Sequence, residues 1–135
     1  MILGDDAVSA IWKYLNSHIE EIGLSQGRIF KYERTEKLAA GSYIVINHLP
    51  FVRRNVVEVG VVNVNIHVPK TLSNEPNSKE LLSYAKKILS LFDDKGTSLG
   101  GCIFEFYADS RPTRDNDNTY YVNMKFNVTY NNLKE

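Results

Sequence analysis

The three histidines of this sequence, His18, His48 and His67, are the side chains best suited to bind a metal ion, but their spacing does not favour one. They form neither an HxH nor an HExxH motif, the spacings that bring two imidazoles together. His18 and Glu21 share one helical face and offer two ligands, although the solvated polar side of a helix is the simpler interpretation. The sequence therefore predicts no metal site.

Two further segments have the composition of ligand-binding loops without the required pattern. Residues 115–118, Asp-Asn-Asp-Asn, begin like a calcium loop, but the central glycine is missing and Phe126 stands where the bidentate glutamate belongs. Residues 96–101 are rich in glycine, yet they connect a predicted helix to a predicted strand, and a phosphate-binding loop has the opposite order and a lysine. We expect no cofactor at either segment.

Cys102, the single cysteine, is the candidate nucleophile. A thiol acts in catalysis where a base and an orienting group converge on it. Cys102 alternates with Phe104 and Phe106, which favours a small apolar residue in the core. Because no base, nucleophile and orienting group occur at a familiar spacing, we predict that the protein is not an enzyme.

Polar side chains on two loops and two strands are the candidates for contact with another protein. Arginine is enriched at interface hot spots, and amides on an uncharged strand face suit a hydrogen-bonded subunit contact. Solvated loop charges and an asparagine-rich source proteome would explain the same residues. The predicted interface residues are Arg53, Arg54, Asn63, Asn65, His67, Arg111, Arg114, Tyr121, Asn123 and Lys125.

Two amphipathic helices are expected to help position these side chains. Residues 5–22 carry apolar side chains at spacings of three and four, which predicts a helix that ends at Gly23. A second helix is predicted over residues 78–92, where Asn77 and Glu80 have the spacing of a capping box. Both helices have one apolar stripe and need a surface to cover.

Runs of β-branched and aromatic side chains predict the strands. The expected strands cover residues 28–33, 42–49, 56–68, 102–108 and 119–130. In the third of these, apolar alternation holds on both sides of a one-residue slip at Gly60, which predicts one long, bent strand with a β-bulge beside that glycine. The last strand alternates throughout, so one of its faces is dry and the other wet.

These elements predict an α+β fold, a mainly antiparallel twisted sheet of about four to five strands with two amphipathic helices packed on one face. The length of 135 residues suits a single domain over residues 1–135. Lys plus Arg equals Asp plus Glu at 16 each, so we expect no sequence-specific nucleic-acid partner. With no signal peptide, no long apolar run and one cysteine, we expect an intracellular protein with no membrane partner.

The order of elements resembles the tail terminator, or tail completion, proteins of phages and prophages with long non-contractile tails. The likeness covers the helix over residues 6–22, the strands at 43–46 and 57–68, the helix over 78–92, and the closing strands at 103–107 and 120–130. It rests on architecture, because no signature motif accompanies it.

The resemblance implies a structural virion assembly protein without cofactors. Such a subunit forms a hexameric ring with copies of itself, caps the tail tube, ends polymerisation of the tail-tube protein and offers a docking surface to the head-connector protein. It would be found in the cytoplasm of the bacterial host during assembly and then in the virion tail.

Two other classes of function remain open from the sequence. One is a small α+β enzyme or ligand-binding module with a pocket between sheet and helices, lined by Tyr43, Tyr107, Tyr120 and Cys102. The other is RNA binding through aromatic side chains on an open sheet, which the balanced charge and the single wet-face aromatic of the last strand, Tyr121, disfavour.

Overall fold

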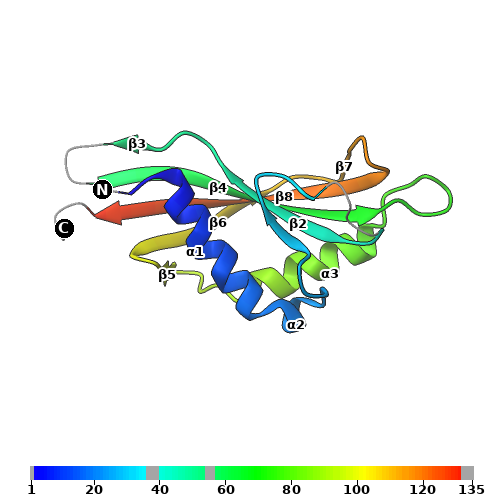
Figure 1. Ribbon diagram of the computed structural model, residues 1–135, viewed down its shortest axis with the longest axis horizontal. Helices are drawn as coiled ribbons and strands as arrows, with labels where there is room; N and C mark the ends of the chain where they lie inside the picture. The colour runs from blue at the N-terminus through cyan, green and yellow to red at the C-terminus, as the bar shows by residue number, and fades with distance from the viewer. Residues whose placement is uncertain (1, 36–39, 54–56, 132–135) are drawn as a thin grey trace.

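The described part of the chain, residues 2–35, 40–53 and 57–131 of a computed structural model, contains three helices and eight strands (Figure 1). The helices are α1 (Gly4–Ser17), α2 (Ile19–Ile22) and α3 (Ser78–Leu89). The strands are β1 (Ile29–Lys31), β2 (Tyr43–His48), β3 (Val52–Arg53), β4 (Val57–Pro69), β5 (Thr97–Leu99), β6 (Cys102–Asp109), β7 (Thr113–Arg114) and β8 (Thr119–Asn131). They form one sheet in the order β1-β2-β4-β8-β6-β5, with β3 beside β4 and β7 beside β8.

The two longest strands, β4 and β8, form the centre of the sheet. Each has 13 residues, and they pair antiparallel from Val57 opposite Asn131 to Pro69 opposite Thr119. Because successive side chains of a strand point to opposite faces, alternate residues of both strands point toward the helices. These residues are apolar and buried: Val62, Val64, Ile66, Val68, Val122, Met124, Phe126 and Val128.

Helices α1 and α3 cover the same face of the sheet and close the core (Figure 1). Helix α1 packs against β1, β2 and β4, and α3 packs against β4 and β8. Their apolar stripes supply Ala7, Val8, Ile11, Leu15, Leu81 and Ile88 to the core. Among the described residues, no helix has both the length and the hydropathy that crossing a bilayer requires.

The prediction of a mainly antiparallel sheet of four to five strands with two helices is wrong, although the fold is α+β. The sheet has eight strands and is mixed, because β1 pairs with β2 in parallel, with Ile29 opposite Ile44. Strands β3, β5 and β7 have only two or three residues each, which is too short for a period-two pattern to be visible in the sequence.

The third helix arises because the segment predicted as one helix over residues 5–22 is interrupted. His18 has φ −115° and ψ 20°, outside the α-helical region, so α1 ends at Ser17 and the short α2 follows. Gly23 has φ 94°, the left-handed conformation of a helix C-cap, which confirms it as the end of the helical segment.

The predicted β-bulge beside Gly60 is wrong. Strands β4 and β8 pair through Gly60 without any shift of register. Val59 and Val61 therefore lie on the same face as Asn63, away from the helices, instead of joining the core. The register shift that the sheet does contain lies in β6, between Phe106 and Ala108.

Close packing explains the glycine at position 60. A Cβ atom there would lie 2.2 Å from the ring of Phe51, which comes from the connection between β2 and β3. Phe51 packs against the core on the helix side of the sheet. The glycine thus lets an aromatic ring lie directly on the backbone of β4.

The predicted start of α3 is confirmed, since Asn77 Oδ1 accepts a hydrogen bond from the backbone N–H of Glu80 at 3.3 Å. We expect Asn77→Ala to destabilise the protein by about 0.5–2 kcal/mol, because that N–H loses its partner. Urea denaturation followed by circular dichroism measures the change. The control is Ser78→Ala at the neighbouring exposed position, and an equal loss in both variants would contradict a role for the cap.

Candidate binding groove on the uncovered sheet face

The sheet face opposite the helices carries a groove of about 700 Å³ between two loops. Its floor comes from β2, β4 and β8, and its walls come from the segment after β1 and from the loop before β8. The lining residues are Tyr32, Glu33, Arg34, Tyr43, Val45, Asn47, Asn63, Asn65, His67, Asp115, Asn116, Asp117, Tyr121, Asn123 and Lys125. Polar and aromatic side chains predominate, so this surface differs in kind from the apolar core on the other face.

Two rows of hydrogen bonds cross the floor of the groove. In the first, Lys125 Nζ on β8 donates to Asn63 Oδ1 on β4 at 2.9 Å, and Asn63 Nδ2 donates to Asn47 Oδ1 on β2 at 2.9 Å. In the second, Asn123 Nδ2 donates to Asn65 Oδ1 at 2.8 Å. The strand register produces these rows because it places each asparagine opposite its partner.

His67 lies at the end of the groove, held between two tyrosine rings. Its ring is parallel to that of Tyr43, at an angle of 6° with centroids 4.5 Å apart, and it stacks on Tyr121 at 5.2 Å. All three residues occupy one cross-strand row of β2, β4 and β8. Only 7% of His67 is exposed, so packing fixes the orientation of its imidazole.

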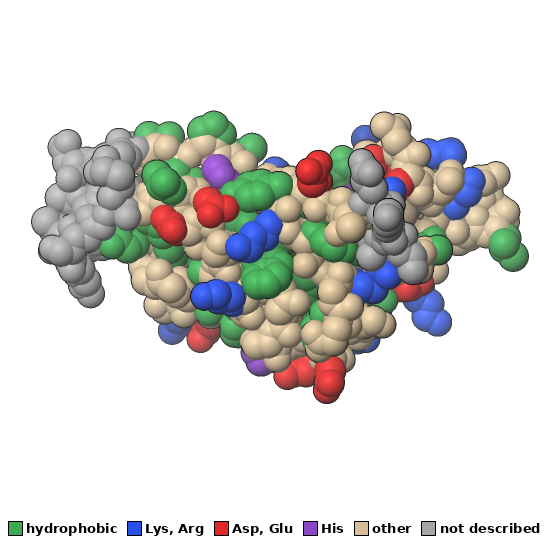
Figure 2. All heavy atoms as spheres, in the orientation of Figure 1, with side chains coloured by type: hydrophobic (Ala, Val, Ile, Leu, Met, Phe, Trp, Pro, Cys, Tyr) green, Lys and Arg blue, Asp and Glu red, His purple; other side chains and the backbone are tan. Residues whose placement is uncertain are grey.

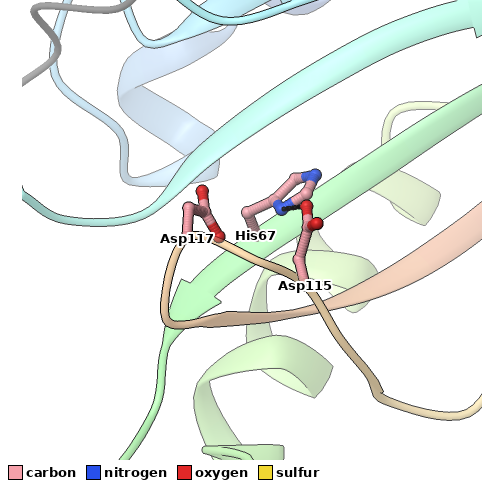
Figure 3. Close-up of side chains that lie close together, drawn as sticks. All are labelled: His67, Asp115 and Asp117. Atoms are coloured by element: carbon pink, nitrogen blue, oxygen red, sulfur yellow. Dashed lines mark ion pairs between the residues drawn. The ribbon is translucent and has the colours of Figure 1, made fainter.

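The loop before β8 brings two carboxylates to this imidazole. It turns within residues 115–118, where the N–H of Asp115 donates to the carbonyl of Thr119 at 2.9 Å and Asn118 adopts a left-handed φ of 65°. Asparagine and aspartate tolerate such turns. Figure 3 shows Asp115 and Asp117 beside His67, with Asp115 Oδ2 3.6 Å from His67 Nδ1.

The carboxylate of Asp117 accepts several hydrogen bonds at this end of the groove. The hydroxyl groups of Tyr43 and Thr119 both donate to its carboxylate, and the backbone N–H of Thr119 donates to Oδ1 at 3.2 Å. Arg34 Nε, from the opposite wall, lies 3.4 Å from Oδ2. The carboxylate therefore links both walls of the groove to its floor.

Burial and hydrogen bonding set the protonation states of the cluster. Burial lowers the pKa of His67 and outweighs the two carboxylates, so the imidazole is neutral near pH 7. Burial, then the hydrogen bond to Asp117, raises the pKa of Tyr43, which stays a donor. Burial alone would raise the pKa of Asp117, but the hydrogen bonds from Thr119 and Tyr43 prevail and hold it below its usual value.

The structure brings six of the predicted interface residues together on this one face. They are Asn63, Asn65, His67, Tyr121, Asn123 and Lys125, and all six line the groove. The side chains of Asn63, Asn65, Asn123 and Lys125 bond to one another or to a neighbouring strand, and Asn63 is buried at 6% exposure. The alternation of β4 and β8 was the signal that found them.

The four predicted arginines are divided between two places. Arg111 and Arg114 are exposed on the hairpin between β6 and β8, with Arg114 in β7 opposite Tyr120. Arg53 belongs to β3, opposite Glu58 of β4. Arg54 lies outside the described residues.

The four residues suggested for a pocket between sheet and helices do not converge. Tyr43 lines the groove on the uncovered face, whereas Cys102 is fully buried in the core on the helix face, which confirms its prediction as a core residue. Tyr120 points to the core side, and Tyr107 is 49% exposed. The sheet lies between the side chain of Tyr43 and that of Cys102, so these residues cannot line one cavity.

The sequence pattern missed the cluster of His67, Asp115 and Asp117. The distance along the chain between β4 and the loop hides it, and the pattern of residues 115–118 by itself resembles only the start of a calcium loop. Arg34 was missed as well, because it lies in a segment without periodicity. His18 and Glu21, by contrast, do meet as the spacing suggests, with His18 Nδ1 2.8 Å from Glu21 Oε1 on an exposed helix surface.

Figure 2 shows Lys and Arg side chains interspersed with Asp and Glu, in keeping with a net charge of zero. No protein-family model matches the chain, and no curated protein is significantly similar to it.

Proposed function

We propose that the chain is a structural subunit that assembles with copies of itself into a ring and caps the tail tube of a phage. The observation that supports this proposal best is the uncovered face of the sheet, which no described helix covers. In most proteins the apolar faces of a sheet are buried, and a face that is exposed to solvent is polar. Here the groove end is polar, and the other end exposes apolar side chains beside Asn127 and Glu105.

The apolar side chains belong to one cross-strand row over β3, β4, β8 and β6, here called the apolar row, in which Thr129 is the polar member. Val52 lies opposite Val59, Val59 opposite Thr129, and Thr129 opposite Ile103. Val52 is 53% exposed and Ile103 is 48% exposed. Exposed apolar side chains gathered on one face favour a contact with another protein.

In this proposal the uncovered face contacts neighbouring copies of the chain. The tail-tube protein and the head-connector protein bind elsewhere on the subunit. The exposed hairpin with Arg111 and Arg114 is available to one of these two partners. The protein would act without a cofactor and without catalysis, in the bacterial host cytoplasm during assembly and then in the virion tail. The resemblance in the order of elements supports the phage assignment.

Light scattering coupled to size exclusion tests the assembly. We expect oligomers that form with rising concentration, and rings in negative-stain micrographs when tail-tube protein is added. Ile103→Glu should shift the protein to the monomer, because it places a charge in the apolar row. The control is Leu82→Glu on α3, which is 55% exposed on the helix side.

Two results would contradict the assembly role. A protein that stays monomeric at every concentration and ignores tail-tube protein contradicts it. So does an oligomer that Leu82→Glu disrupts and Ile103→Glu leaves intact, because the contact would then lie on the helix side.

A further inference from the structure

We propose that His67, Asp115 and Asp117 form a binding site for a divalent transition-metal ion, with Zn²⁺ as the best match. This goes beyond the proposed assembly role and does not depend on it. One ligand atom of each side chain lies within 4.8 Å of the other two (Figure 3). Imidazole nitrogen and carboxylate oxygen are both ligands that Zn²⁺ takes in proteins.

The distances are close to those of an assembled site. Bonds of about 2.0–2.2 Å to nitrogen and oxygen place tetrahedral ligands about 3.4 Å apart. His67 Nδ1 and Asp115 Oδ2 are already 3.6 Å apart. The Asp117 carboxylate oxygen lies within 4.8 Å of both of these atoms.

The surroundings hold two of the three ligands in place. His67 is fixed by the rings of Tyr43 and Tyr121, and the Asp117 carboxylate is fixed by the hydroxyls of Tyr43 and Thr119. Hydrogen bonds of this kind from outer groups orient metal ligands and strengthen binding. These bonds are in place without the ion and hold both side chains near the site. Binding of the ion replaces the bond between Thr119 Oγ1 and His67 Nδ1 and one of the bonds to Asp117.

Binding of an ion to His67 Nδ1 requires the proton on that nitrogen to move to Nε2. The single hydroxyl hydrogen of Thr119 is donated to Asp117, so the 3.1 Å contact between Thr119 Oγ1 and His67 Nδ1 uses the proton of Nδ1. When the ion binds Nδ1, that proton moves to Nε2, which bonds to no other described residue. The imidazole exchanges one hydrogen bond for a bond to the metal.

The ligand set also selects the class of ion. Mg²⁺ and Ca²⁺ prefer six or more oxygen ligands, and imidazole suits Zn²⁺ and its neighbours in the first transition row. Three protein ligands leave one tetrahedral position for water or for a donor group in the groove. The site thus lies where a bound molecule in the groove would reach the ion.

Calorimetric titration of the full chain with ZnCl₂, and the visible absorption of added Co²⁺, test this site. We expect one ion per chain, and a dissociation constant at least about ten-fold weaker in Asp115→Asn and in His67→Gln. Two control variants, Asp109→Asn on the exposed end of β6 and His18→Gln on the other histidine–carboxylate pair, should bind as the unaltered protein does. Circular dichroism checks that each variant folds, and Asp115, half exposed on the loop, is the variant safest for the fold.

Three results would overturn the site. The first is no Zn²⁺ binding by the folded protein. The second is binding that Asp115→Asn and His67→Gln leave unchanged. The third is binding that His18→Gln abolishes, which would assign the ion to the helix surface.

Discussion

Phe126→Ala is expected to lower the free energy of unfolding by about 3–5 kcal/mol, because it removes a large ring from the centre of the core and leaves a cavity. Phe126 has no exposed surface. Its ring lies 4.6 Å from that of Phe92, after α3, and 5.6 Å from that of Phe106 on β6. Urea denaturation monitored by circular dichroism measures the loss.

The matched control for this change is Tyr107→Ala, at the residue next to Phe106 in β6. Tyr107 is 49% exposed, so its truncation should change the free energy of unfolding by no more than about 0.5 kcal/mol. Equal effects of the two substitutions would contradict the assignment of the two faces of β6.

Asn63→Ala should destabilise the protein by about 1–3 kcal/mol, although the side chain lies on the face opposite the core. Asn63 is 6% exposed and is the middle member of the row from Lys125 to Asn47. Its loss leaves a half-buried ammonium group and an amide oxygen without their partner. Denaturation in urea again gives the change.

Asn127→Ala is the control on the same face of the sheet. Asn127 lies on β8 like Lys125, but it is exposed and its side chain makes no hydrogen bond within the described residues. We expect a change of no more than about 0.5 kcal/mol. If both variants lose stability equally, strand propensity rather than the hydrogen-bonded row explains the effect.

Long periodic elements could be predicted from the sequence because their pattern repeats enough times to be read. The alternation of residues 119–130 placed Met124 and Phe126 in the core, and the stripe over residues 78–92 identified α3. The short strands could not be found in this way, since two or three residues have no period. The parallel pairing of β1 was missed because it depends on the path of the connection to β2.

The slip at Gly60 shows how one pattern permits two structures. A bulge would have kept Val59 and Val61 in the core, whereas the uninterrupted register places them on the uncovered face. The ring of Phe51 lies where a Cβ atom of residue 60 would be, and this tertiary contact cannot be predicted from the local sequence.

The candidate site was predictable only in part for the same reason. Asn63, Asn65 and Lys125 could be assigned to one face from alternation alone. The meeting of His67 with Asp115 and Asp117 depends on where an irregular loop crosses the sheet, and no spacing rule specifies that.

The central position of β4 and β8 has a consequence for the speed of folding. These strands meet along their whole length, yet α3, β5, β6 and β7 separate them in the chain. Contacts between distant segments require a long loop to close before they stabilise anything, and domains rich in such contacts fold on the order of milliseconds to seconds. Until β8 pairs, the apolar edge of β4 is available to another chain, so dilute refolding should give a higher yield than concentrated refolding.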